Sequence, residues 1–311
     1  MHIRKNSLYN LHFKVSPSVL IACIFLVNSA STLANSIAIN HSQLEQYIAL
    51  TDENVLLKPA GEGVFLSFDL NESWRVKFDY QTWQDTKQAT TPVTIELDFV
   101  SFGGSLEYTQ DTWYAATSIG FSEDDISYRV SQRLTDKRQN NTQVTAISTV
   151  VGKSWLSGNW MFDLSLGAQY ADWSIENKTF NNDQAQQDGK PAQEITTSGS
   201  DSTSVNAGVT VARYWQLSQT QGILVGVLLA WNYQFSGDAE LRADNAAPAR
   251  RSSGQSSSAV RNTSGDDNYG QVMTYLSYDI NDEWSVDVDT AVEIATANNN
   301  ISWSIGLSYT F

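Results

Sequence analysis

Apolar and small polar positions alternate strictly at the end of the chain. From Ile301 to Phe311 every odd position is large and apolar, and every even position is Ser, Gly or Thr. Because successive side chains of a β-strand point to opposite faces, this pattern predicts a strand with one apolar face and one polar face.

The same alternation recurs earlier in the chain. The apolar set of residues 160–170 is Trp160, Phe162, Leu164, Leu166, Ala168 and Tyr170, and that of residues 223–235 is Ile223, Val225, Val227, Leu229, Trp231, Tyr233 and Phe235. Trp160 and Tyr170 would lie roughly 25 Å apart along the axis of a barrel of tilted strands, which matches the apolar band of a membrane barrel. A soluble sandwich has shorter strands with aromatic residues in mid-strand, so the pattern favours a transmembrane barrel.

Short turns separate these predicted strands. Residues 66–76 and 276–286 share one pattern, a strand, an Asn/acid turn and a new strand that opens on Trp. Further turns are predicted at 109–112, 157–159 and 218–221. These turns alternate with polar segments, and in outer-membrane barrels short turns are periplasmic and longer loops are extracellular. The predicted extracellular loops are 84–92, 122–143, 177–201 and 236–266, with a short one at 297–300.

The fold class predicted is all-β, a transmembrane antiparallel up-and-down β-barrel. Eleven strands are counted from residue 63 onward, and bacterial single-chain barrels have even strand numbers. We therefore expect a first strand near 44–57 and twelve strands in all, with ten as the alternative if a segment such as 93–108 is misread. Residues 35–62 are an amino-terminal lead-in that includes this possible first strand, and 63–311 form the barrel.

The amino terminus has the pattern of a cleaved secretory signal peptide over residues 1–34. Basic residues precede an apolar run at 19–27 that is too short to span a bilayer, and small residues at 32–34 predict cleavage after Ala34. Cys23 gives a loose likeness to a lipoprotein signal, but the apolar run continues past it. The expected mature chain has 311 − 34 = 277 residues and lacks cysteine.

Charge and composition narrow the function classes. Three of the 19 Lys and Arg residues and none of the 34 Asp and Glu residues fall in the predicted signal, which leaves a net charge of 16 − 34 = −18. That sign disfavours nucleic acid as a partner. The 10 Trp, 13 Tyr and 12 Phe residues are typical of the aromatic girdles of membrane barrels.

The carboxyl-terminal strand resembles the assembly signal of Gram-negative outer-membrane β-barrel proteins. The residues that carry this resemblance are Gly306, Leu307, Tyr309 and terminal Phe311. It implies insertion by the barrel-assembly machinery into the bacterial outer membrane, with membrane lipid and lipopolysaccharide as surroundings. The chain is also similar in form to porins and to an autotransporter barrel without a passenger domain, and the resemblance identifies no specific subfamily.

Charged residues that alternate with the apolar faces are the candidate lining of the barrel lumen. They are Asp69, Arg75, Lys77, Asp79, Glu96, Asp98, Asp163, Asp279, Asp287, Asp289 and Glu293. One interpretation is an aqueous pore that favours cations, because rings of Asp and Glu select for cations. The other is a narrow lumen filled by ion pairs that stabilise it, and twelve strands are compatible with both.

Two further charged segments have several interpretations. The loop 236–266 carries Arg242, Arg250, Arg251 and Arg261, which could constrict the mouth, bind lipopolysaccharide phosphates or stay exposed to solvent. The acidic run 123–125 lacks the ligand spacing of a cation-binding loop, so we expect it to be solvated.

Enzymatic activity is not expected. Only His41 remains after signal cleavage, so a Ser–His or Asp–His site is disfavoured, and the scarcity of His and Cys disfavours a metal site or other cofactor. The leading hypothesis is a passive channel for ions or small hydrophilic solutes. The alternative is a structural or adhesive surface barrel with a plugged lumen that acts through its extracellular loops.

Overall fold

The computed structural model describes most of the chain that follows the predicted signal peptide. The described residues are 36–49, 54–88, 93–130, 137–181, 192–236, 241–245, 258–262, 268–294 and 301–311. The predicted signal at 1–34 lies outside them. No helix within these ranges is long and apolar enough to cross a membrane.

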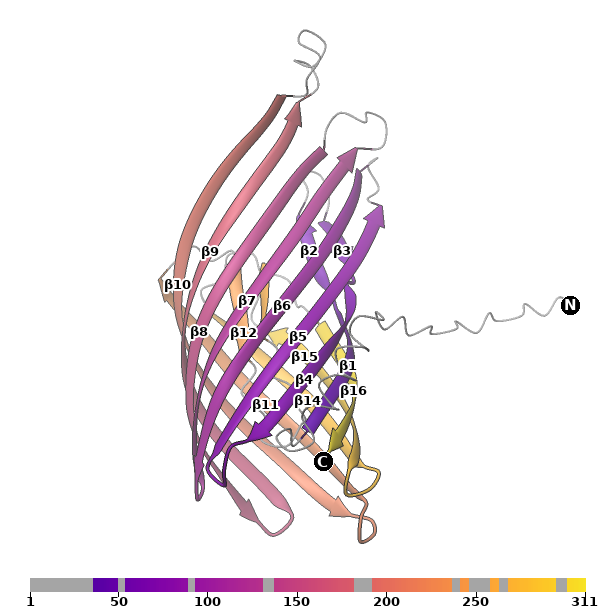
Figure 1. The fold of residues 1–311 in the computed structure, drawn as a ribbon, viewed down its shortest axis with the longest axis vertical. Coiled ribbons are helices and arrows are strands. Elements are labelled where there is room, and N and C mark those ends of the chain that lie inside the picture. Colours follow the sequence, from indigo (N-terminus) through magenta and orange to yellow (C-terminus); the bar gives the residue numbers. More distant parts are fainter. Residues whose placement is uncertain are drawn as a thin grey trace, which may run out of the picture. The chain divides into compact units, whose positions relative to one another are not determined.

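Twelve antiparallel strands close into a barrel, which confirms the predicted fold class (Figure 1). Closure is made by β1, which pairs with β16 on one side and with β4 on the other. In order around the wall the strands are β1 (Ser36–Leu44), β16 (Ile301–Thr310), β15 (Trp284–Ile294), β14 (Asn268–Asp279), β11 (Gly222–Ser236), β10 (Ala192–Gln216), β9 (Trp160–Asn181), β8 (Lys137–Ser157), β7 (Trp113–Val130), β6 (Val93–Gln110), β5 (Trp74–Gln88) and β4 (Ala60–Asp69).

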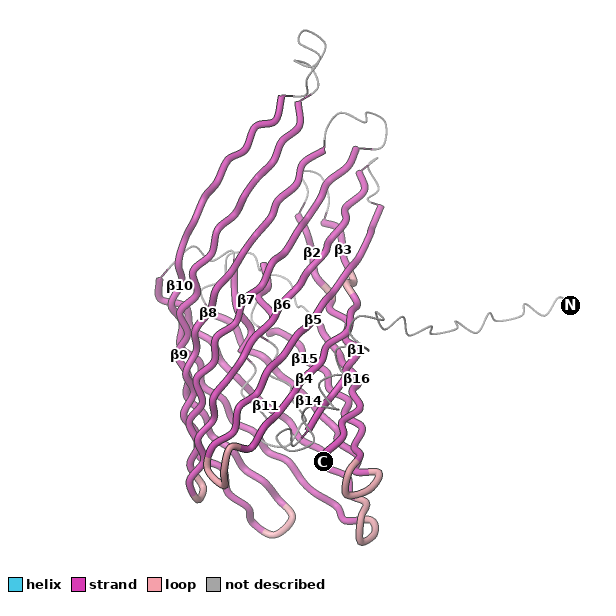
Figure 2. Tube along the Cα trace, viewed as in Figure 1, coloured by secondary structure: helices cyan, strands magenta, loops and turns pink. Residues whose placement is uncertain are grey.

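The first strand lies earlier than the sequence predicted. The expected position near 44–57 is wrong, because β1 occupies Ser36–Leu44, where Ile39 is paired with Leu307 of β16 and with Val64 of β4. Residues 46–57 instead form a hairpin of β2 (Gln46–Ala49) and β3 (Asn54–Leu57). A second short hairpin, β12 (Leu241–Asn245) and β13 (Ser258–Asn262), lies between β11 and β14 in the chain. Figure 2 shows how completely strands dominate the described residues.

All five predicted short turns occur, and the repeated sequence pattern has a shared cause. Asn71 Oδ1 accepts hydrogen bonds from the backbone N–H groups of Ser73 and Trp74, both at 2.9 Å. Asn281 Oδ1 does the same for Glu283 and Trp284, at 2.9 and 2.8 Å. Each Asn side chain thereby fixes a turn and sets a Trp at the start of the next strand.

The predicted loops 122–143 and 177–201 are largely strand. Pairing of β7 with β8 continues from Trp113–Lys153 to Arg129–Lys137, and pairing of β9 with β10 continues to Asn181–Ala192. β10 has 25 residues, whereas about 9–11 suffice to cross a membrane. Polar Ser, Thr and Asn residues extend the ladder here because both faces of the sheet are outside the apolar band. The wall is therefore tallest along β8, β9 and β10 (Figure 1).

The outer face of the membrane-spanning wall is apolar. Among the exposed large apolar residues are the sets predicted from the sequence, including Trp160, Leu164, Leu166 and Tyr170 of β9 and Val225, Val227, Leu229, Trp231 and Tyr233 of β11. The alternating residues face inward and are mostly polar and buried. In a closed barrel this arrangement places lipid outside and a polar lumen inside.

Candidate functional site

The inner face of the wall is the candidate site, and it holds most of the charged residues that the sequence singled out. Asp79 and Asp163 are buried there, as are Asp287 and Glu293, which are 5% and 2% exposed. By strand alternation and direct pairing, the same face carries Asp69, Arg75, Lys77, Asp279 and Asp289. These residues come from β4, β5, β9, β14 and β15, so the fold distributes acids around the lumen.

The prediction was wrong for Glu96 and Asp98. Both lie on the same face of β6 as Val100 and Phe102, which are exposed on the outer face. The inward residues of this stretch are Ile95, Leu97 and Phe99, all buried. The sequence suggested the reverse because apolar residues normally face lipid, but this part of β6 is on the extracellular side of the membrane.

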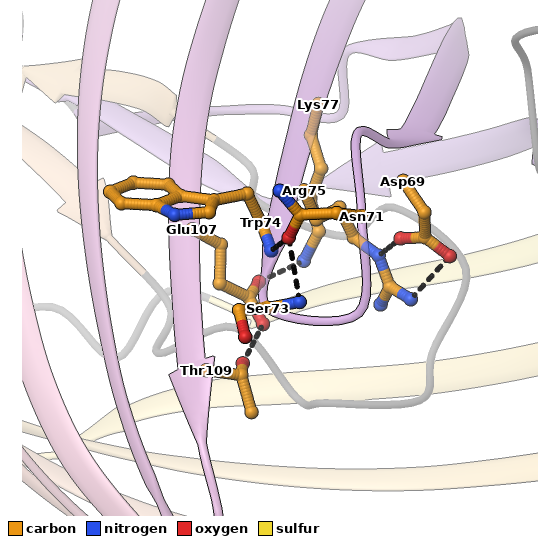
Figure 3. Close-up of polar contacts among 8 residues, drawn as sticks. All are labelled: Asp69, Asn71, Ser73, Trp74, Arg75, Lys77, Glu107 and Thr109. Atoms are coloured by element: carbon orange, nitrogen blue, oxygen red, sulfur yellow. Dashed lines mark hydrogen bonds and ion pairs between the residues drawn. The ribbon is translucent and has the colours of Figure 1, made fainter.

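Two ion pairs lie near the periplasmic end of the lumen (Figure 3). Arg75 donates to Asp69 through Nε at 2.5 Å and through a terminal nitrogen at 3.2 Å. Lys77 Nζ lies 2.9 Å from Glu107 on the neighbouring strand, in a more buried position. Asp69, Arg75 and Glu107 also line a pocket of about 480 Å³ that is open at this end. Glu107 was not singled out from the sequence, although its position opposite Arg75 follows from the β5–β6 register.

A second group of acids lies on β15. Asp287 and Asp289 share the inner face, where Asp287 accepts a hydrogen bond from Ser308 at 3.4 Å and Asp289 accepts one from Ser304. Both hydroxyl groups come from the small polar positions of the terminal strand β16. The alternation that makes the outer face of β16 apolar therefore also supplies hydroxyl partners to the acids of the lumen.

Inward tyrosines narrow the lumen, and the sequence reading missed them. Tyr114 donates to Asp163 at 2.9 Å and Tyr214 donates to Asp279 at 3.4 Å, in each case across an intervening strand. Each ring lies against a glycine of the adjacent strand, and a Cβ atom at Gly152 would overlap the Tyr114 ring. Gly152 is paired directly with Tyr114, and Gly222 lies against Tyr214, so an inward glycine beside an inward tyrosine was the available signal.

The β2–β3 hairpin packs on the extracellular part of the inner face. Val55 and Leu57 of β3 form a buried cluster with Trp83, Ile95, Leu97, Phe99 and Ile126 from β5, β6 and β7. Trp83 also donates to Ser42 Oγ of β1 at 2.6 Å, and directly after the hairpin the backbone N–H of Lys58 donates to Asp85 at 2.6 Å. The hairpin is thus fixed to one side of the lumen by apolar contacts.

The β12–β13 hairpin approaches the same side. Residues of β13 lie within 8 Å of β6 and β7, Cα to Cα, although the hairpin is connected to β11 and β14. Those two pairs of strands are separated around the wall by β8, β9 and β10. The register pairs Arg242 with Arg261, and Arg250 and Arg251 lie outside the described residues.

Asp124 is the notable member of the acidic run 123–125. It faces inward between Phe99 and Thr142, and its Oδ1 atom is buried without a hydrogen-bond partner among the described residues. Burial, together with the charges of Asp125 and Asp98, raises the pKa of Asp124 to about 7. The expectation that the whole run is solvated is therefore wrong for this residue. Within the described ranges, no three His, Cys, Asp or Glu residues gather as a metal site.

Comparisons with solved structures agree with this architecture. The translocator domain of the autotransporter NalP from Neisseria meningitidis superposes with a TM-score of 0.62 at 10% identity, over 94% of this chain and 96% of that one. The beta domain of the Bordetella autotransporter BrkA gives a TM-score of 0.57 at 12% identity, over 90% of this chain and 100% of that one. At these identities the likeness concerns the fold. No curated protein sequence matches this chain.

Residues 76–291 match the family model described as the autotransporter beta-domain. The matched region runs from β5 into β15 and contains most of the barrel wall. Together with the barrel geometry, this places the protein in the bacterial outer membrane, in lipid, where barrels of this type are inserted by the barrel-assembly machinery. The chain belongs to the autotransporter beta-domain family.

Proposed function

We propose that this barrel is a narrow passage that carries cations or small hydrophilic solutes across the outer membrane. The observation that carries the proposal is the charge of the inner face. In the membrane-spanning part of the described wall, Arg75 and Lys77 are each held by an acid, Asp69 and Glu107. The same face also carries Asp79, Asp163, Asp279, Asp287, Asp289 and Glu293. Such an excess of acids attracts cations and repels anions.

The inner hairpins and tyrosines support a narrow lumen. The β2–β3 hairpin covers the extracellular part of β5, β6 and β7, and Tyr114 and Tyr214 project from the wall nearer the periplasmic end. Glu293 is 2% exposed, so its carboxylate is covered and does not border a wide water-filled channel. The proposed passage therefore has low conductance and suits ions and small solutes.

The test is ion selectivity after neutralisation of the β15 acids. The triple variant Asp287→Asn, Asp289→Asn and Glu293→Gln is compared with wild type in planar bilayers under a salt gradient. The account predicts a reversal potential that moves toward zero. The control is the variant Asp172→Asn with Asp201→Asn, since these two acids face each other on the exposed outer face. An unchanged reversal potential in the triple variant would show that these residues do not set the ion selectivity of the passage.

We also propose that the protein is not an enzyme. His41 belongs to β1 of the barrel wall. It shares the outer face with Ile37 and Ile39, opposite Ile305 and Glu62. Hydrolysis assays with phospholipid and peptide substrates check this proposal, and turnover that His41→Gln abolishes would contradict it.

The tall part of the wall favours a second candidate function, attachment to another surface. β8, β9 and β10 continue far beyond the length needed to cross the membrane, and their outer parts are polar. The test variant replaces residues 174–199 with an Asn-Gly turn. Because Ser174 and Gly199 are paired with each other, the register of the remaining β9 and β10 residues does not change. Loss of cell attachment with unchanged conductance would support this function, and retained attachment would reject it.

A further inference from the structure

The outer face of the barrel carries a basic residue among the tryptophans of the periplasmic girdle. Arg213 lies near the end of β10 and is paired directly with Trp160, the first residue of β9. Its guanidinium carbon is 5.2 Å from the centre of the Trp160 ring and 5.1 Å from that of Trp215. Both rings are partly open to the surroundings, at 42% and 38% exposure. This end of β10 is opposite to the tall extension of the wall (Figure 1).

Within the described residues, no acidic side chain adjoins Arg213 on the outer face. The neighbouring positions on the outer face are Trp160, Val225, Val211 and Trp215, and none of them is acidic. The Nε atom is buried and has no hydrogen-bond acceptor within the described part of the chain. Cation–π contacts use the flat face of a guanidinium group, so they leave the terminal N–H donors in its plane available to an acceptor.

We propose that Arg213, Trp160 and Trp215 form a binding site for the phosphate of an anionic phospholipid in the periplasmic leaflet. A guanidinium group offers parallel N–H donors to two phosphate oxygens, and such charge-assisted bonds are strong outside water. The two indole rings hold the group in place and contact the glycerol and upper acyl region, where aromatic girdles normally lie. The whole chain has a formal net charge of −15, so attraction of an anionic lipid requires a local basic residue of this kind.

Lys153 provides an internal comparison. It lies on the same outer face, 5.2 Å from the ring of Trp113 and paired directly with it. In the described part of the chain a single indole contacts this ammonium group, which lacks a planar set of donors. The proposed site therefore depends on the chemistry of Arg213, whereas a general attraction between lipid and basic residues would involve Lys153 equally.

The test is native mass spectrometry of the protein purified from outer membranes in detergent. The added lipids are phosphatidylglycerol and a glucosyl diacylglycerol with the same chains, which lacks phosphate. We expect wild type to prefer phosphatidylglycerol. This preference should fall about tenfold in Arg213→Gln, because the neutral amide cannot form the charge-assisted pair with phosphate. We expect partial retention in Arg213→Lys and little change in Lys153→Gln. Heat-modifiable migration on gels shows that each variant is folded.

Three results would overturn the proposal. Equal retention of both lipids by wild type would mean that phosphate is not recognised. An equal loss in Lys153→Gln and Arg213→Gln would mean a diffuse surface attraction. Displacement of phosphatidylglycerol by millimolar inorganic phosphate would assign the site to a free anion and not to a lipid headgroup.

Discussion

At the scale of single residues, Asp124 links the structure to a measurable dependence on pH. Its carboxyl group lies beyond Phe121, outside the apolar band, with a pKa raised from 3.8 to about 7 mainly by burial. Between these values the folded protein holds a proton that the unfolded chain releases. The contribution of this group to stability therefore falls as the pH rises from about 4 to 7.

We accordingly predict that Asp124→Asn is more stable than wild type at neutral pH and about equal to it below pH 4. The amide removes the cost of a buried charge and retains the shape of the side chain. Urea unfolding in detergent micelles at several pH values measures the effect. The control is Glu123→Gln, an exposed neighbour on the outer face. A stability difference between Asp124→Asn and wild type that does not vary with pH would be inconsistent with the assignment.

The contact between Tyr114 and Gly152 leads to a second prediction. A Cβ atom at position 152 would overlap the Tyr114 ring, so Gly152→Ala must displace the ring from its bond with Asp163. We expect a loss of about 1–3 kcal/mol in the free energy of unfolding. Gly104→Ala is the matched control, because its nearest neighbour would be Phe78 at an acceptable 3.4 Å. Equal stability of the two variants would contradict this packing argument.

Strand alternation allowed most inward acids to be located from the sequence but failed for Glu96 and Asp98. It worked for Asp287 and Asp289 because their apolar neighbours Val286 and Val288 face lipid. On β6 the apolar residues Leu97 and Phe99 face inward against Val55 and Leu57 of a distant segment. That tertiary contact reverses the usual relation between polarity and face, and no local pattern indicates it.

At the scale of elements, the β2–β3 hairpin is predicted to restrict the passage. Its attachment rests on Val55 and Leu57, which are buried against β5, β6 and β7. Replacing both residues with Ser removes apolar contacts but leaves the barrel strands intact. We expect a larger and noisier single-channel conductance, because the hairpin is released from the inner face.

Leu156→Ser is the control for that experiment, since Leu156 is exposed at the periplasmic turn. Conductance that stays at the wild-type level in the Val55 and Leu57 variant would show that the hairpin does not limit the passage. A matching rise in the Leu156 variant would show that the effect is not specific to the hairpin.

Turns were more predictable than strand ends. The turn at 71–74 depends on one Asn side chain and its own backbone, so the local sequence determines it. The ends of β9 and β10 depend on each other, because polar residues there are held by pairing across the hairpin. Composition predicted loops at 122–143 and 177–201, where the structure has mostly strand. Composition could not separate the two, because Ser, Thr and Asn occur both in loops and in sheets exposed on both faces.

At the scale of the whole molecule, the outer face, the inner face and the closure follow from one alternating pattern. The terminal strand β16 presents its apolar residues to lipid, offers hydroxyl groups to Asp287 and Asp289, and pairs with β1 to close the wall. The sequence was therefore sufficient for the barrel and its location in the membrane. It was not sufficient for the lumen, whose width depends on hairpins and tyrosines that come together only in the folded barrel.

Single-channel conductance of the purified protein in a planar bilayer, recorded under a salt gradient, tests the central claim most directly. The account predicts small, stable steps with a reversal potential of the sign expected for cations. Folded, heat-modifiable protein that shows no steps, or steps that favour anions, would contradict a narrow acid-lined passage.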